Sequence, residues 1–599
     1  MSLVTLPTEI LTWIIKLTVP SGFESLLLAG SHRIYACGAQ FIAAHNQRKK
    51  TWRRLYLQHH EDPRILERAR WAVDFLYAVA AKDPLIPLYV EELELGYNLD
   101  YYFYIQDVAI ARDRAMGVAD AEINASEEQK ASLRLDGQMH WQWQWPGNEW
   151  LRNDPAALQK MRDLIEGSPR LRAAGVNVEH WADKMLGAER EGDGSRLNHS
   201  HPLHIFLFIL SLMDNLRKLT IIAWPWADDL RRLDFIFRDP ALLEGAEIEV
   251  QGEEKHGAEE TGWVDEEMEE HPELAQVLTY LVRKANNCYN RSNPPAALSR
   301  LREFRQEDEW PGDTDKSPVP LRCYSPFLSL HSLEVFSVAH TAAFEPGPTY
   351  FCSPLFQPCR PPGSSLRRIH LPYGYISPAS LSRLLAHTAP RLESFSYVHL
   401  EYEATPGPSW IWDVGTFVTV LERACGETLV SLSLFAENEP PDLGAGREPI
   451  TSLRGLTNLR GFRVDCSSFL RANADAEALI EGEETSDDER LEESLRERIK
   501  AVRPLRDILP PSLRYLLLSV PQHVPRQVET GRTLLEALRK DFGPSSTTLE
   551  AGASLESFAI ERLCRVREYW DPDNFADFAE SAEIATSFFT EIVFTKYLT

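Results

Sequence analysis

The segment LESFSY, residues 392–397, contains the pattern that decides the fold of this chain. An apolar residue opens the segment, and two more apolar residues follow at its fourth and sixth positions. The last two are one residue apart, so both point to the same face of a short strand, and the first lies in the turn that enters it. The same spacing occurs in eight segments: LRKLTI (216–221), LEVFSV (333–338), LRRIHL (366–371), LESFSY (392–397), LVSLSL (429–434), LRGFRV (459–464), LRYLLL (513–518) and LESFAI (555–560).

Amphipathic helices are predicted before three of these strands. In the first of them, Leu381, Leu384 and Leu385 recur at helical spacing and form one apolar stripe. One helix, one turn and one strand are too small to bury such a stripe, so the units have to stack on one another. The three helical segments are PASLSRLLAHTAP (378–390), VGTFVTVLERACGE (414–427) and TGRTLLEALRKDFG (530–543).

This succession of helices and strands resembles a leucine-rich-repeat protein. The resemblance implies an α/β fold, an irregular solenoid with parallel strands on its concave face and helices outside. The spacing between segments is irregular, and the Asn that usually follows the third Leu is absent. The alternative is an irregular α/β domain whose strands share the spacing by chance.

The composition is that of a globular protein. Of the 599 residues, 44% are apolar and 25% are charged. A single core stops growing at about 250–300 residues, so the length predicts several domains or an extended repeat array. No apolar run approaches the ~20 residues that span a bilayer. Glu9 and Lys16 interrupt the amino terminus, which therefore does not resemble a signal peptide.

The net charge of −26 argues against a protein whose main role is to bind the phosphate backbone of nucleic acids. The basic run NQRKKTWRR (46–54) is interpreted as a solvated helix end, with a nucleic-acid patch as the alternative. We therefore expect neither a nucleic-acid partner nor a membrane partner. The cysteines form no CxxC pair and predict reduced thiols in a cytoplasmic or nuclear protein. They are Cys37, Cys288, Cys323, Cys352, Cys359, Cys425, Cys466 and Cys564.

Two acidic insertions interrupt the repeated pattern, near 252–273 and at 481–500. Such segments bury too little apolar surface to stay ordered alone, although the second can end in a helix. Ser486 is followed by three acidic residues and is a candidate phosphorylation site, with an unmodified solvated loop as the alternative.

The amino terminus predicts three short helices within about fifty residues. The first begins at Pro7, where the missing N–H costs nothing. The helices carry more apolar surface than so small a bundle buries by itself, so a partner has to cover the rest. Ile10, Ile14 and Leu17 form one stripe of the first helix, and Leu11 and Ile15 form a second. The second helix begins after Ser21, which is its predicted N-cap. Its inner face is formed by Phe23, Leu26, Leu27, Gly30 and Ile34. The third helix runs from about Gly38 to Lys50.

These residues resemble an F-box. LPTEIL (6–11) matches the family phrase LPxEIL, Ile14 supplies the next apolar position, and SGFESLLLAGSHRIYACGAQFI (21–42) is similar to the version found in filamentous-fungal F-box proteins. Gly22 stands where the family usually has an acidic residue. The resemblance covers under a tenth of the chain.

The resemblance implies a substrate receptor of a Skp–cullin–F-box ubiquitin ligase. Its amino-terminal helices would bind the Skp-family adaptor and, through it, the cullin, and its repeats would hold an unknown protein substrate. The residues expected at the adaptor are Leu6, Pro7, Ile10, Leu11, Ile14, Leu26, Leu27 and Leu28. Substrate would contact side chains that alternate outward along the strands: Arg368, His370, Ser394, Ser396, Ser431, Ser433, Arg463 and Tyr515.

Two further stretches invite a chemical interpretation. NHSHPLH places His199, His201 and His204 close together, but nearby residues do not complete a metal-ligand set, and a loop that enters a buried helix is favoured. The alternating Trp141, Trp143 and Trp145 in HWQWQWPGNEW (140–150) are interpreted as packing side chains, with a peptide anchor as the alternative. Motifs of hydrolases and nucleotide-binding enzymes are absent. We expect no catalysis, no cofactor and no metal; a hydrolase without a recognisable motif is the weakest alternative.

The predicted organisation is an F-box at 1–55, a helical and aromatic connecting region at 56–200, and the repeat domain at 201–599. The main alternative function is a repeat scaffold or regulatory binding protein outside any ligase. The apolar surface of residues 6–34 distinguishes these functions, because a ligase receptor exposes it and a scaffold buries it against its own chain.

Overall fold

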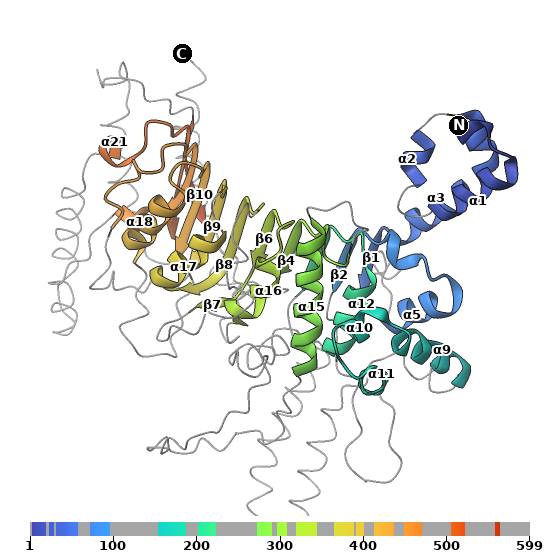
Figure 1. The fold of residues 1–599 in the computed structure, drawn as a ribbon. Coiled ribbons are helices and arrows are strands. Elements are labelled where there is room, and N and C mark those ends of the chain that lie inside the picture. The colour runs from blue at the N-terminus through green and yellow to red at the C-terminus, as the bar shows by residue number, and fades with distance from the viewer. Residues whose placement is uncertain are drawn as a thin grey trace, which may run out of the picture. The chain divides into compact units, whose positions relative to one another are not determined.

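The structure, a computed structural model, describes residues 3–18, 23–28, 31–57, 72–95, 154–186, 202–222, 272–289, 296–307, 319–343, 365–388, 391–399, 413–436, 449–469, 505–521 and 557–563. They belong to an α/β protein in which parallel strands alternate with helices (Figure 1). The chain divides into two compact units, Met1–Glu309 with Ser329–Leu333, and Trp310–Leu328 with Glu334–Thr599.

The first unit begins with helices and continues with four parallel strands in the order β1-β2-β3-β4. Its elements are η1 (Leu3–Thr5), α1 (Thr8–Thr18), α2 (Phe23–Leu28), α3 (His32–Trp52), β1 (Arg54–Leu57), α5 (Ala72–Tyr77), η2 (Ala78–Lys82), η3 (Ile86–Tyr89), β2 (Glu92–Leu95), α9 (Pro155–Glu166), α10 (Pro169–Ala173), α11 (Val178–Leu186), α12 (Pro202–Leu212), β3 (Lys218–Ile222), α15 (Pro272–Tyr289) and β4 (Glu303–Glu307).

The second unit contains the parallel order β6-β8-β9-β10-β11-β12-β13, with β7 pairing to both β5 and β8. Its elements are β5 (Val319–Pro320), η4 (Leu321–Tyr324), α16 (Ser325–Leu328), β6 (Val335–Val338), β7 (Thr341–Ala343), β8 (Arg368–Ile376), α17 (Pro378–Thr388), β9 (Ser394–His399), α18 (Val414–Cys425), β10 (Ser431–Ala436), β11 (Gly461–Asp465), η6 (Cys466–Phe469), α21 (Leu505–Ile508), β12 (Tyr515–Pro521) and β13 (Ser557–Leu563).

Every one of the eight segments with the repeated pattern contains a strand, namely β3, β6 and β8 to β13. The reason is visible in LESFSY, where Leu392, Phe395 and Tyr397 are all fully buried and the residues between them are not. Alternating burial of this kind places one face of each strand in a core and leaves the other face accessible. The prediction of parallel strands from this pattern is confirmed.

A recurring pair of backbone hydrogen bonds joins neighbouring repeats at the entry to β2, β3, β4 and β8 to β12. The N–H groups of Val430 and Ser431 both donate to the carbonyl of Glu393, at 2.8 and 3.0 Å. The N–H groups of Arg460 and Gly461 share the carbonyl of Val430 in the same way, at 2.8 and 3.1 Å. Because one carbonyl receives two donors at each step, the turn that carries the first Leu is held in register with the preceding repeat.

Five strands lie outside the predicted set: β1, β2, β4, β5 and β7. β1 crosses the boundary that was expected between the F-box and the connecting region, and β2 lies inside the connecting region, which was expected to be helical and aromatic. Their sequences WRRLYL (52–57) and VEELEL (90–95) have the same apolar spacing, and LREFRQ (301–306) of β4 differs by a buried Gln306 at its last position. The expected boundary at residue 201 therefore does not mark the start of the strands.

Helices α17 and α18 pack against each other and cover the buried face of the neighbouring strands (Figure 1). Leu381, Leu384 and Leu385 of α17 are all buried, as their spacing predicts. Phe417 of α18 is stacked on Tyr397 with 4.8 Å between ring centroids. The helices thus fill one side of this sheet. The third predicted helix, residues 530–543, lies outside the described residues.

A buried polar cluster lies at an irregularity in β8, where the register of the pairing with β9 shifts between Leu371 and Gly374. The hydroxyl of Tyr397 donates to the carbonyl of Gly374 at 2.8 Å and accepts the N–H of Ile376 at 3.1 Å. It also lies 2.9 Å from Nδ1 of His399. Burial raises the pKa of Tyr397 above its ordinary value. A side chain at Gly374 would put a Cβ 2.8 Å from the Tyr397 ring, so the bulge needs glycine.

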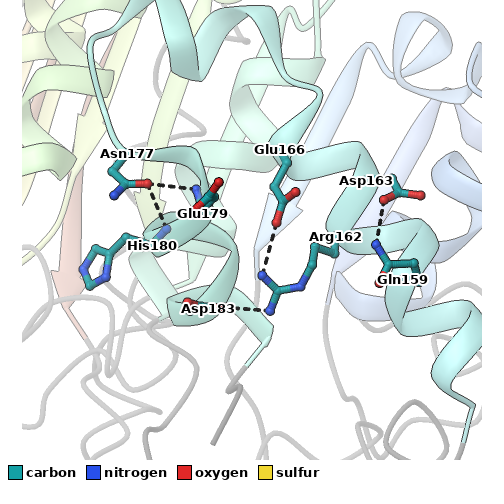
Figure 2. Close-up of polar contacts among 8 residues, drawn as sticks. All are labelled: Gln159, Arg162, Asp163, Glu166, Asn177, Glu179, His180 and Asp183. Carbon is teal, nitrogen blue, oxygen red and sulfur yellow. Dashed lines mark hydrogen bonds and ion pairs between the residues drawn. The ribbon is translucent and has the colours of Figure 1, made fainter. Parts of the chain in front are cut away.

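The helical layer of the first unit is tied together by polar side chains (Figure 2). Arg162 of α9 donates to Asp183 of α11 at 2.7 Å. Asn177 caps α11, because its Oδ1 accepts the N–H groups of Glu179 and His180 at 3.1 and 3.2 Å. These contacts all lie within or between helices, so we interpret them as structural.

We expect Asn286→Ala to destabilise the first unit by about 1–3 kcal/mol, because its side chain satisfies two backbone groups at once. Its Nδ2 donates to the carbonyl of Ser329 and its Oδ1 accepts the N–H of His331, both at 2.9 Å. Asn287→Ala is the matched control, since this neighbour on the same helix is exposed. Hydrogen exchange at residues 329–333 measures the effect, and equal protection in both variants would contradict it.

Candidate interaction surfaces

Helices α1, α2 and α3 form a small core of their own. Leu11, Ile15, Phe23 and Ile34 are at most 2% exposed, and partly buried residues from α2 and α3 pack around them. Ile34 belongs to α3 and not to the second helix, because α2 ends at Leu28 and α3 begins at His32. The expected third helix therefore starts earlier than Gly38. The predicted N-cap Ser21 lies outside the described residues.

The outer side of this cluster carries large apolar side chains. Ile10, Trp13 and Leu17 are 48%, 64% and 64% exposed. Their spacing of three and four residues puts them on one face of α1, and we call these three residues the α1 stripe. Of the eight large apolar side chains exposed in the described part of the chain, six lie within the first 35 residues: Leu3, Ile10, Trp13, Leu17, Leu28 and Tyr35.

The residues predicted at the adaptor divide between the outside and the core of the cluster. Ile10, Pro7 and Leu28 are exposed, and Leu28 reaches 85%. Leu11 is fully buried, which is a correction, because a side chain inside the core offers no contact to a partner. The remaining predicted residues are partly buried: Leu6, Ile14, Leu26 and Leu27.

Sequence reasoning missed Trp13, the largest side chain of the α1 stripe. The signal was present in LPTEILTWIIKL (6–17), where Trp13 follows Ile10 by three residues and precedes Leu17 by four. The outward position of Trp13 could not be recognised because α1 is apolar around most of its circumference. Several apolar stripes therefore fit the same sequence.

The long helix α3 connects this cluster to the strands of the first unit. His45, which is 5% exposed, contacts the ring of Phe23 in the cluster and places Nδ1 3.0 Å from the hydroxyl of Tyr89 in η3. Arg48 forms an ion pair with Asp83 beside the same contact. β1 begins two residues after the end of α3, so the cluster continues into the first strand without a long linker.

The predicted substrate residues form two rows across the accessible face of the second unit's sheet. The strand register aligns the first row as Arg368, Ser394, Ser431, Gly461 and Tyr515. All eight predicted residues are exposed or partly buried, and Tyr515 is 50% exposed. The second row, two residues further along each strand, is His370, Ser396, Ser433, Arg463 and Leu517.

The other residues singled out in the sequence offer little chemistry. His204 is buried in α12 beside Trp181, with Nε2 3.3 Å from Glu273, which fits the prediction of a buried helix. The described residues contain no group of three or more His, Cys, Asp or Glu side chains suited to a metal. Cys425 is a buried free thiol whose pKa burial raises to about 12. His199, His201, Trp141, Trp143, Trp145, Ser486 and the acidic insertions up to residue 271 and at 481–500 lie outside the described residues.

No protein-family model matches this chain. A search of curated proteins finds no significant match either. The assignment of a function therefore depends on the chain's own residues and their geometry. Within the described ranges, no helix is both long and apolar enough to cross a membrane.

Proposed function

We propose that this chain is the substrate-recognition subunit of a Skp–cullin–F-box ubiquitin ligase. In this proposal α1, α2 and α3 are the F-box and bind the Skp-family adaptor, which in turn binds the cullin. The strands line the concave face of a leucine-rich-repeat solenoid and bind a protein substrate there. The chain itself performs no catalysis and positions the substrate for other subunits in the cytoplasm or nucleus.

The exposed α1 stripe is the observation that carries the proposal. A helix that turned its apolar residues only into its own chain would leave Ile10, Trp13 and Leu17 covered, whereas they are about half or more exposed. Tryptophan in the middle of an apolar patch is typical of residues that dominate binding energy at protein interfaces. Exposed apolar side chains scattered singly need no partner, but six of eight within 35 residues favour a docking surface.

The local sequence supports an F-box over another helical cap. LPTEIL opens α1, with Pro7 directly before the helix and its carbonyl accepting the N–H of Leu11 at 2.9 Å. The three helices follow one another within 52 residues and share one small core. The strand face of the second unit supplies the separate surface that a substrate receptor requires.

The experiment that tests the proposal is a binding measurement between the full chain and a purified Skp-family adaptor. Wild type is expected to bind, and the double variant Trp13→Ala with Leu17→Ala is expected to bind about a thousandfold more weakly, because each residue is a candidate hot spot worth about 2 kcal/mol. Alanine favours helix, so α1 should remain folded. Lys16→Ala, at an exposed position of the same helix, is the control and should bind like wild type.

Absence of binding by wild type would overturn the proposal and favour the scaffold function. Binding that is equally strong in the double variant would show that the α1 stripe is not the docking surface. Circular dichroism of both variants excludes loss of the helices as a cause.

A further inference from the structure

Gly461, the first residue of β11, is a glycine that the described part of the chain does not require. Its N–H donates to the carbonyl of Val430 at 3.1 Å, and its φ lies outside the left-handed region. A Cβ at this position would meet only the Oγ of Ser431 among the described atoms, at 3.9 Å. At Gly374, by contrast, a Cβ would lie 2.8 Å from a tyrosine ring. There is therefore room for a side chain above Gly461.

A glycine within a paired strand needs a reason, because it loses more conformational entropy on folding than other residues and has no side chain to pack. It often marks a bulge, a tight bend, or a place where a ligand approaches the backbone closely. β11 pairs with β10 and with β12 in regular register, without a bulge. The close approach of a ligand to the accessible face of the sheet is the reason that remains.

The two strands beside β11 bring exposed apolar side chains to this place. In the described part of the chain, the large apolar side chains exposed outside the first 35 residues are Val430, at 36%, and Tyr515, at 50%. Val430 directly precedes β10, and Tyr515 opens β12 opposite Gly461 in the register. We call Val430, Ser431, Gly461 and Tyr515 the glycine recess. Its walls favour an apolar side chain as the group that enters it.

The spacing of the strands sets the width of the glycine recess. β10 and β12 are two strand steps apart, about 9.6 Å. A ring halfway between them lies about 4.8 Å from the side chains of β12, and aromatic rings stack with their centroids about 4.5–7 Å apart. The exposed part of Tyr515 therefore offers a stacking surface to one flat ring. Ser431, on the opposite side, is small enough to leave that position open.

A cation without an acidic neighbour stands beside the glycine recess. At the equivalent position before β8, Arg367 forms an ion pair with Glu393 at 2.8 Å. Arg460 directly precedes β11, and its backbone is hydrogen-bonded to Val430 on one side and to Arg514 on the other. Its side chain is exposed and forms no hydrogen bond or ion pair with another described residue. A carboxylate next to the recess can therefore bind it.

We propose that the glycine recess binds an aromatic side chain from an extended segment of a partner protein, and that Arg460 binds the carboxylate of an adjacent acidic residue. This inference rests on the proposed function in so far as that function assigns this face to substrate, and it defines the class of substrate by two side chains. The ring stacks on Tyr515, and the charge of Arg460 selects the acidic neighbour. Glycine stands at position 461 because a side chain there would occupy the place of the ring.

The test measures binding of three fluorescein-labelled peptides to the full chain by anisotropy. Gly/Ser residues flank the cores Glu-Phe-Glu, Glu-Ala-Glu and Gln-Phe-Gln. We expect the Glu-Phe-Glu peptide to bind most tightly, and its binding to weaken as salt rises. Loss of the ring and loss of the charges should each weaken binding about tenfold. Equal binding of all three peptides, or binding of none, would overturn the inference.

Gly461→Leu fills the recess from the chain itself and should weaken binding of the Glu-Phe-Glu peptide about tenfold or more. Because a Cβ fits there and glycine is unfavourable in a strand, hydrogen exchange in β11 should be as slow as in wild type or slower. Retained protection with lost binding is a result that a merely structural glycine would not give. Arg460→Ala, which changes an exposed side chain, should weaken binding about tenfold and decides the result if Gly461→Leu loses protection.

Ala424→Leu and Arg423→Ala are the controls, because both residues are exposed on α18, in the layer of helices. They should bind the peptide like wild type, and effects equal to those of Gly461→Leu and Arg460→Ala would overturn the inference. Adaptor binding is measured on the same preparations. Peptide failure with adaptor binding intact overturns only this inference, whereas adaptor failure with selective peptide binding overturns the ligase proposal.

Discussion

Leu11→Asp is expected to unfold the helical cluster α1–α3, whereas Trp13→Asp two residues later is expected to leave it folded. Leu11 is fully buried beside Ile15, Phe23 and Ile34, and Trp13 is 64% exposed. A carboxylate inside this core has no described cationic partner among those residues, and burying an unpaired charge costs several kcal/mol. A bundle of about fifty residues has too small a core to absorb that cost.

Hydrogen exchange across residues 8–52 measures this difference. Leu11→Asp should lose protection in all three helices, and Trp13→Asp should keep it while losing adaptor binding. Native protection in Leu11→Asp would contradict the assignment of Leu11 to the core. The comparison matters for function, because loss of adaptor binding in a Leu11 variant reports unfolding and not the position of the docking surface.

Phe417→Ala is expected to cost the second unit about 3–5 kcal/mol, as is usual when a fully buried Phe is truncated. The ring of Phe417 is 0% exposed, lies 4.8 Å from the ring of Tyr397 and 5.9 Å from that of Phe395. Its removal leaves a cavity between α18 and β9.

Hydrogen exchange in β9 and β10 is the appropriate measurement, since unfolding of a chain with two units is not one transition. Thr416→Ala, at the exposed preceding position of α18, is the control and should change protection little. If both variants exchange alike, the contact between α18 and β9 does not stabilise this part of the sheet.

Much of the repeat architecture follows from local pattern. A strand with one buried face alternates with period two, so LESFSY and its seven counterparts specify both the strand and the side that faces the core. The same argument places Arg368, Ser394 and Ser431 on the accessible side. Their alignment into one row required the register of the strands, which depends on backbone hydrogen bonds between repeats and leaves no mark in any single segment.

Other strands were missed although they share the spacing. WRRLYL and VEELEL contain charged residues between their apolar positions, and each lies far from the later cluster of repeats on which the prediction mainly rested. In LREFRQ the last position is Gln306, a polar side chain that is nevertheless 3% exposed. Burial of that amide is decided by the strands beside it and not by its own hydropathy.

The sequence by itself determined two features. The first helix is too apolar to face water on all sides, and the repeated strands pair in parallel. Only the tertiary structure decided which side of α1 faces inward. Leu11 and Ile15 meet Phe23 and Ile34 in the core, while Ile10, Trp13 and Leu17 remain outside. The physical reason is that the hydrophobic effect is non-directional: it favours burial of apolar area and does not select which apolar side chains are buried. A helix that is apolar nearly all round is oriented by the shape of what packs against it.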